Sequence, residues 1–103
     1  SLDYLLKYPW PQSPQAFRQQ VQAIADFDAT SWLGLISAPT LVLAGEQDLL
    51  MPPGDAEYLV QQLPNAVLQV LPGAAHSVQT EQPEAFVQAV VNFCRGEADA
   101  FCT

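Results

Sequence analysis

The sequence predicts an α/β fold in which helical segments precede a parallel strand–helix–strand–helix unit. Residues 40–44 (TLVLA) are apolar on both faces, which is typical of a parallel strand covered by helices above and below. Residues 67–71 (VLQVL) form a second strand pattern, and a helical pattern separates the two. A strand–helix–strand connection of this length almost always makes a right-handed parallel crossover, so we expect the strands side by side.

The composition is that of one folded domain with a core. The chain has 103 residues, of which 50% are hydrophobic. Its formal net charge is −8, with Lys7, Arg18 and Arg95 as the only basic side chains. This excludes electrostatic binding to nucleic acid or to an anionic membrane. The apolar runs are far shorter than the ~20 residues of a membrane span, and no signal peptide is evident, so Ser1 is expected to be an internal starting point.

The sequence provides no recognisable set of metal ligands. Cys94 and Cys102 are the only cysteines, His76 is the only histidine, and no calcium-loop pattern occurs. We therefore expect no metal and no other cofactor. Two cysteines do not make a disulfide framework in a chain of this length, which favours a reducing, cytoplasmic location.

The N-terminal part is predicted to contain a helix that follows a proline-rich linker. Residues 1–13 hold a short apolar segment that ends among prolines. From Ser13 as N-cap a helix is expected to run to about Phe27, with apolar side chains at helical spacing (Phe17, Val21, Ile24 and Phe27). A helical turn around residues 31–35 follows, in which we expect Trp32 to anchor the core.

The strand–helix–strand–helix unit comes next along the chain. Gly45 closes the first strand, and a helix is expected from about Asp55 to Leu63, where Pro64 stops it. Pro72 and Gly73 end the second strand. The last helix is expected from about Glu81 or Pro83 to Cys94, with Gly96 ending it and residues 96–103 forming a flexible tail.

An acid and a base follow the two strands at equivalent places. Glu46 and Asp48 come directly after the first strand, and His76 follows the second. In an open parallel sheet, ligands bind beyond the carboxyl ends of the strands. We therefore expect Asp48 and His76 at the same end of the sheet, with their side chains near hydrogen-bonding distance.

These segments together resemble the C-terminal third of the α/β-hydrolase fold, in particular its haloperoxidase, esterase and enol-lactonase branch. The matching pieces are ISAPTLVLAGEQD (residues 36–48), MPPGDAEYL (51–59) and LPGAAHSVQTEQPEAF (71–86). The resemblance implies that Asp48 is the acid and His76 the base of a catalytic triad. It also implies that residues 28–95 are the C-terminal unit of the core and residues 1–27 the tail of a lid or cap.

The nucleophile of such a triad is not in this sequence. None of the five serines lies in the G-x-S-x-G elbow, and the oxyanion-hole segment is absent as well. We therefore expect a fragment that supplies the acid and the base of a serine-type hydrolase and is inactive by itself. The resemblance implies an ester, a lactone or a related small carbonyl compound as the substrate of the full-length parent.

Several alternatives stay open at this point. Asp48 could be a turn-forming residue with Glu46 as the acid, His76 could bond only to backbone, and Ser77 could be mistaken for a nucleophile. Some relatives use an aspartate nucleophile, as epoxide hydrolases and dehalogenases do. The chain could also be a non-catalytic module, and its open strand edge predicts a homo-oligomer when it is handled alone. Three residues could line a substrate pocket or simply pack: Met51, Trp32 and Tyr4.

Overall fold

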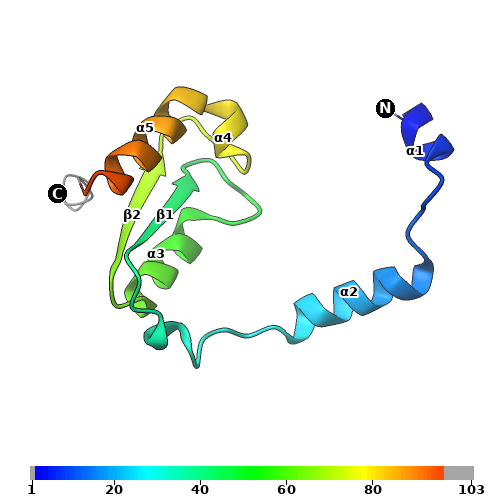
Figure 1. Ribbon diagram of the computed structural model, residues 1–103, viewed down its shortest axis with the longest axis horizontal. Helices are drawn as coiled ribbons and strands as arrows, with labels where there is room; N and C mark the ends of the chain where they lie inside the picture. Colours follow the sequence, from blue (N-terminus) through cyan, green and yellow to red (C-terminus); the bar gives the residue numbers. More distant parts are fainter. Residues whose placement is uncertain (1, 97–103) are drawn as a thin grey trace.

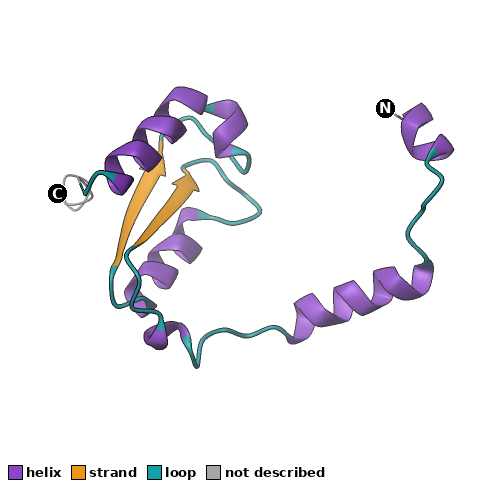
Figure 2. Cartoon of the chain, viewed as in Figure 1, coloured by secondary structure: helices purple, strands orange, loops and turns teal. Residues whose placement is uncertain are grey.

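The computed structural model describes residues 2–96, so most of the expected tail, residues 97–103, lies outside the described residues. Two helices and a short 3-10 turn precede an alternation of strands and helices (Figure 1, Figure 2). The α/β fold predicted from the sequence is confirmed. In chain order the elements are α1 (Leu2–Lys7), α2 (Pro14–Asp26), η1 (Leu33–Leu35), β1 (Thr40–Gly45), α3 (Pro53–Gln62), β2 (Ala66–Leu71), α4 (Val78–Glu81) and α5 (Pro83–Cys94).

Strands β1 and β2 are parallel and, in the part of the chain that the structure describes, form a two-stranded sheet. Their register pairs Thr40 with Ala66 and Gly45 with Leu71, so both strands end at the same level. The predicted parallel crossover is therefore confirmed. Helix α3 makes this crossover, and α3 and α5 pack on the strands from opposite sides (Figure 1).

Two prolines set helix boundaries that the sequence pattern placed differently. Helix α3 begins at Pro53 rather than Asp55, because the fixed φ of proline suits the first turn of a helix. The expected loop before the last helix contains the short helix α4, and Gln82 then leaves the helical conformation at φ −134° and ψ 64°. Pro83 disfavours helical dihedrals at the residue before it, which explains why α4 and α5 are separate helices.

The N-terminal arm, defined as residues 2–32, extends away from the strand–helix unit (Figure 1). Helix α2 begins as predicted, because the Ser13 hydroxyl accepts a hydrogen bond from the Ala16 N–H at 3.0 Å. The Cα radius of gyration is 17.3 Å, whereas a compact domain of this length has about 13 Å. The segment before the prolines forms α1, where the sequence indicated only an apolar stretch.

The apolar stripe of α2 is exposed rather than packed. Its members lie on the surface of the arm: Phe17, Val21 and Ile24, with Phe27 just beyond the helix. The expectation that Trp32 anchors the core is wrong for this structure, because its side chain is 43% exposed and contacts Phe27 edge-on, with ring centroids 6.2 Å apart. The arm does not reach the core of the strand–helix unit, so no buried site is available to Trp32.

The described core is small and lies around the strand ends. Its buried apolar residues are Ala44, Leu63, Leu71, Ala74 and Ala89. Among them, Ala44, Leu71 and Ala74 lie at or beside the points where the strands end, so the best-packed region adjoins the loops that carry Asp48 and His76. No helix within residues 2–96 is both long and apolar enough to cross a membrane.

Candidate active site

The site begins at Gly45, the last residue of β1. A Cβ atom at this position would lie 2.6 Å from the Ala74 carbonyl oxygen and closer still to that of Ala75. Only glycine therefore allows the backbone to approach the segment that leads to His76. Next to Gly45, the Gln47 N–H donates to the Ala74 carbonyl at 2.9 Å, which links the two strand-end loops directly.

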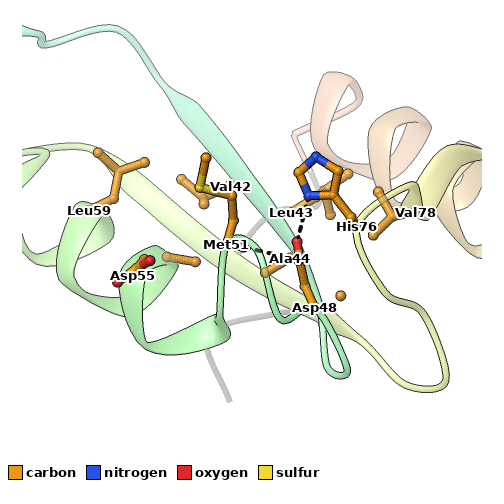
Figure 3. A pocket seen from close by; sticks show the side chains of 11 residues that line it. Val42, Leu43, Ala44, Asp48, Met51, Asp55, Leu59, His76 and Val78 are labelled. Carbon is orange, nitrogen blue, oxygen red and sulfur yellow. Dashed lines mark hydrogen bonds and ion pairs between the residues drawn. The ribbon is translucent and has the colours of Figure 1, made fainter. Parts of the chain in front are cut away.

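Asp48 uses both of its carboxylate oxygens. Its Oδ1 accepts hydrogen bonds from the backbone N–H groups of Leu50 and Met51 at 2.9 and 3.0 Å. Its Oδ2 lies 3.1 Å from Nδ1 of His76 (Figure 3). The side chain is 7% exposed. Asp48 therefore stabilises the turn through Oδ1 and contacts His76 through Oδ2.

The pKa of Asp48 is lowered from its ordinary value. The hydrogen bond from the Met51 N–H contributes most, burial opposes it, and the interactions with His76 and the Leu50 N–H add to the lowering. The carboxylate is therefore ionised at neutral pH and can only accept hydrogen bonds. It follows that Nδ1 of His76 is the donor of the bond between the two side chains.

His76 lies in the loop between β2 and α4, with 52% of its side chain exposed. Because Nδ1 donates to Asp48, the second ring nitrogen, Nε2, carries the lone pair when the imidazole is neutral. Figure 3 shows this nitrogen on the side of the ring away from Asp48. The bond to Asp48 thus favours one tautomer of the neutral ring, in which Nε2 is unprotonated and faces away from Asp48.

A cavity of about 280 Å³ adjoins the pair. Its walls come mainly from β1 and α3, and the side chains are mostly apolar (Figure 3). Met51 lines it together with Asp48 and His76, as the sequence suggested it could. Trp32 and Tyr4 are not part of its lining, and Tyr4 packs against Tyr8 with ring centroids 5.8 Å apart.

The remaining residues considered from the sequence lie beside the pair. The side chain of Glu46 is exposed, and its backbone N–H continues the ladder to Leu71 at 3.1 Å. The carboxylate found at the imidazole is that of Asp48, so the structure does not favour Glu46 as the acid. Ser77 is exposed beside His76. Within the described residues, no three His, Cys, Asp or Glu side chains are grouped as a metal site would require.

Glu81 was not singled out from the sequence, yet it touches the site. Its Oε2 accepts hydrogen bonds from the backbone N–H groups of Ala75 and Ser77, the two neighbours of His76. The signal available in the sequence was the spacing of five residues between the histidine and a carboxylate. That spacing alone does not distinguish a loop-binding side chain from one in solvent.

Comparison with known proteins identifies the family. Residues 4–83 match the alpha/beta hydrolase fold family. The chain belongs to this family. It is similar to RutD of Caulobacter sp. (strain K31), named as a candidate carbamate hydrolase, with 41% identity over 86 residues that cover 84% of this chain and 32% of the relative.

Two further relatives belong to the lactonase and esterase groups by name. The 3-oxoadipate enol-lactonase 2 of Acinetobacter baylyi is 36% identical over 78 residues, covering 76% of this chain and 29% of that protein. A solved thermophilic esterase from Thermogutta terrifontis superposes with a TM-score of 0.66 and 27% identity, covering 84% of this chain and 40% of that one. The chain thus spans about a third of the length of the curated relatives, 32% and 29% for the two named here.

The close approach at Gly45 generates the first prediction. Gly45→Ala is expected to lower the free energy of unfolding by about 1–3 kcal/mol, because backbone atoms must move to admit the methyl group. The control is Gly54→Ala in α3, where a Cβ meets nothing within 4 Å. This control is expected to be neutral or to stabilise by up to about 1 kcal/mol. Urea denaturation followed by circular dichroism measures the free energy of unfolding of both variants. Equal changes in the two would contradict the explanation given for Gly45.

The lowered pKa of Asp48 generates a pH prediction. A carboxyl whose pKa is lower in the folded chain stabilises the fold at pH above its ordinary value of 3.8, and this contribution disappears as the pH falls through the folded value. The stability difference between the parent chain and Asp48→Asn should therefore be constant from neutral to mildly acidic pH and shrink below pH 3.8. Glu57→Gln, at an exposed position on α3, is the matched control. If melting curves show that the stability difference between the parent and Asp48→Asn does not shrink at low pH, the lowered pKa of Asp48 is contradicted.

Proposed function

We propose that this chain is the C-terminal portion of a serine-type α/β-hydrolase, in which Asp48 and His76 are the acid and base of the catalytic triad. The observation that carries the proposal is the 3.1 Å contact between Asp48 Oδ2 and His76 Nδ1. The names of the relatives support an ester, a lactone or a similar small carbonyl compound as the substrate of the full-length protein.

The chemistry follows from the tautomer that Asp48 fixes. His76 Nε2 takes the proton of the attacking hydroxyl as that oxygen bonds to the substrate carbonyl carbon, and the ring later gives the proton to the leaving group. The ionised Asp48 stabilises the imidazolium formed between these two steps. The nucleophile and the oxyanion donors belong to parts of the fold that this sequence does not contain, since it has no G-x-S-x-G elbow.

The division of the chain is part of the same proposal. Residues 28–95 form the C-terminal unit that carries the acid and the base, and residues 1–27 form the end of a lid or cap that precedes it. The extended position of the arm, with an apolar stripe on α2, agrees with a segment that packs against other parts of a larger protein. Cys94 is a free, exposed thiol, which is compatible with a reducing, cytoplasmic setting, while Cys102 lies outside the described residues.

A second candidate function is a non-catalytic association module. It is favoured by one observation, the exposed apolar surface that runs along α2 and its flanking residues. The outer edge of β1 is also unpaired among residues 2–96, so its backbone groups are available to another strand. This function would not require the contact between Asp48 and His76, which is why the hydrolase is preferred.

Activity measurements separate these functions. In the full-length protein that contains this chain, Asp48→Asn and His76→Ala are each expected to lower kcat for a 4-nitrophenyl ester by a factor of about 10³–10⁵. In the chain alone, the parent and His76→Ala should hydrolyse the ester equally slowly, because a base and its acid accelerate little without a nucleophile. Ser77→Ala should change neither rate. A burst of product from the chain alone that disappears in Ser77→Ala would contradict the proposal and point to Ser77.

The exposed apolar surface generates a prediction about assembly. When the chain is handled alone, we expect a homodimer or a higher oligomer, because pairing buries the α2 stripe and the open edge of β1. Light scattering at tens of micromolar checks this. The double variant Val21→Gln, Ile24→Gln should shift the equilibrium toward monomer, whereas Gln19→Ala and Gln20→Ala together should not. A folded parent monomer that binds no hydrophobic dye would contradict the expectation.

A further inference from the structure

We infer that Glu81 is a positioning residue for His76: its carboxylate holds the loop that carries the histidine, so that the imidazole meets Asp48. This inference rests on the proposed function, because it concerns the base of the same site. Glu81 itself touches neither the ring nor Asp48 in the described contacts, and its influence on the chemistry passes through the backbone.

The contacts of Glu81 surround the histidine. Its Oε2 accepts the Ser77 N–H at 3.0 Å and the Ala75 N–H at 3.2 Å, one residue on each side of His76. A single oxygen thus receives two donors from a three-residue stretch of main chain. Both bonds are exposed to solvent, and together they fix the main chain on either side of His76.

The other side of the same stretch is held by β1. The Ala74 carbonyl accepts the Gln47 N–H, and the carbonyls of Ala74 and Ala75 lie against Gly45. The main chain before His76 therefore has its carbonyl groups directed to β1, while the N–H groups on either side of His76 are directed to Glu81. With 52% of its side chain exposed, the imidazole receives little help from packing, so its direction depends on this backbone and on Asp48.

Helix stability does not by itself account for Glu81. The residue is the last of α4, a helix of four residues whose single turn contains it. The bond to the Ser77 N–H could belong to a cap of α4, since the Glu81 N–H in turn donates to the Ser77 carbonyl at 2.9 Å. The bond to Ala75 lies outside the helix and has no role in capping it. That second bond is what connects Glu81 to the position of His76.

The test uses the single histidine of the sequence, because a chain labelled with 15N-histidine then gives signals from one imidazole ring. In the parent chain we expect the Nδ1–H tautomer to predominate at a pH where the ring is neutral. Glu81→Ala is expected to lower the share of this tautomer at least about twofold, toward that of free histidine. Glu81→Gln should keep it, because its amide oxygen can accept the same two backbone donors.

Two further variants complete the design. Glu81→Asp keeps the charge but is one methylene shorter, so it should lose the tautomer preference as Glu81→Ala does, and it decides the question if the alanine variant fails to fold. Glu84→Ala, an exposed carboxylate in the first turn of α5, removes the same charge and should behave as the parent. Far-ultraviolet circular dichroism verifies that each variant is folded.

The outcomes are distinct. If the folded Glu81→Ala and Glu81→Asp variants keep the Nδ1–H tautomer at the parent level, Glu81 is only a helix cap and the inference is wrong. If the parent chain itself lacks this tautomer, the bond between Asp48 and His76 does not form, and the proposed function fails first. In the full-length enzyme, loss of positioning should appear as a fall in kcat of about 10–100-fold with little change in KM, because a displacement of about 1 Å can cost 10² in rate.

Discussion

The contact between the end of β1 and the segment after β2 is the constraint on which the site depends. Gly45 has no side chain, and the carbonyl oxygens of Ala74 and Ala75 occupy the space where one would be. The strands end in register at this level, so the two loops leave the sheet side by side. Without this approach of one backbone to the other, the side chains of Asp48 and His76 would begin too far apart to bond.

The sequence predicted much of this arrangement, because its strongest signals concern the strands and the loops that leave them. Residues 40–44 are a mostly apolar run that ends at glycine, and residues 67–71, apolar except for Gln69, end at proline and glycine. The connection between them has one preferred hand. These features place an acid and a base at one end of the sheet. The contact at 3.1 Å agrees with that expectation, and it shows that turn formation and histidine binding share the carboxylate of Asp48.

The sequence was less informative where a residue depends on distant parts of the chain. Trp32 has a large, mostly apolar side chain of the kind that usually packs in a core. Its burial requires a partner surface, however, and the arm extends away from the described core. Glu81 could not be recognised as part of the site because it lies at the expected start of the last helix, and a glutamate at such a position usually faces solvent. Its role depends on the path of the loop before it, which a helical pattern does not encode. The break at Gln82 could have been anticipated from Pro83.

The sequence distance between Asp48 and His76 is 28 residues, and a single crossover spans it. Closing a flexible loop of that length costs about 3 kcal/mol in chain entropy, and doubling it would add only about 0.6 kcal/mol. Asp48 and His76 therefore belong to one strand–helix–strand unit, and the contact between them is local in sequence compared with any contact to a nucleophile in another part of the fold. The pairing of Asp48 with His76 thus spans only β1, α3, β2 and the loop after β2, so a division of the fold upstream of β1 would leave the two side chains together.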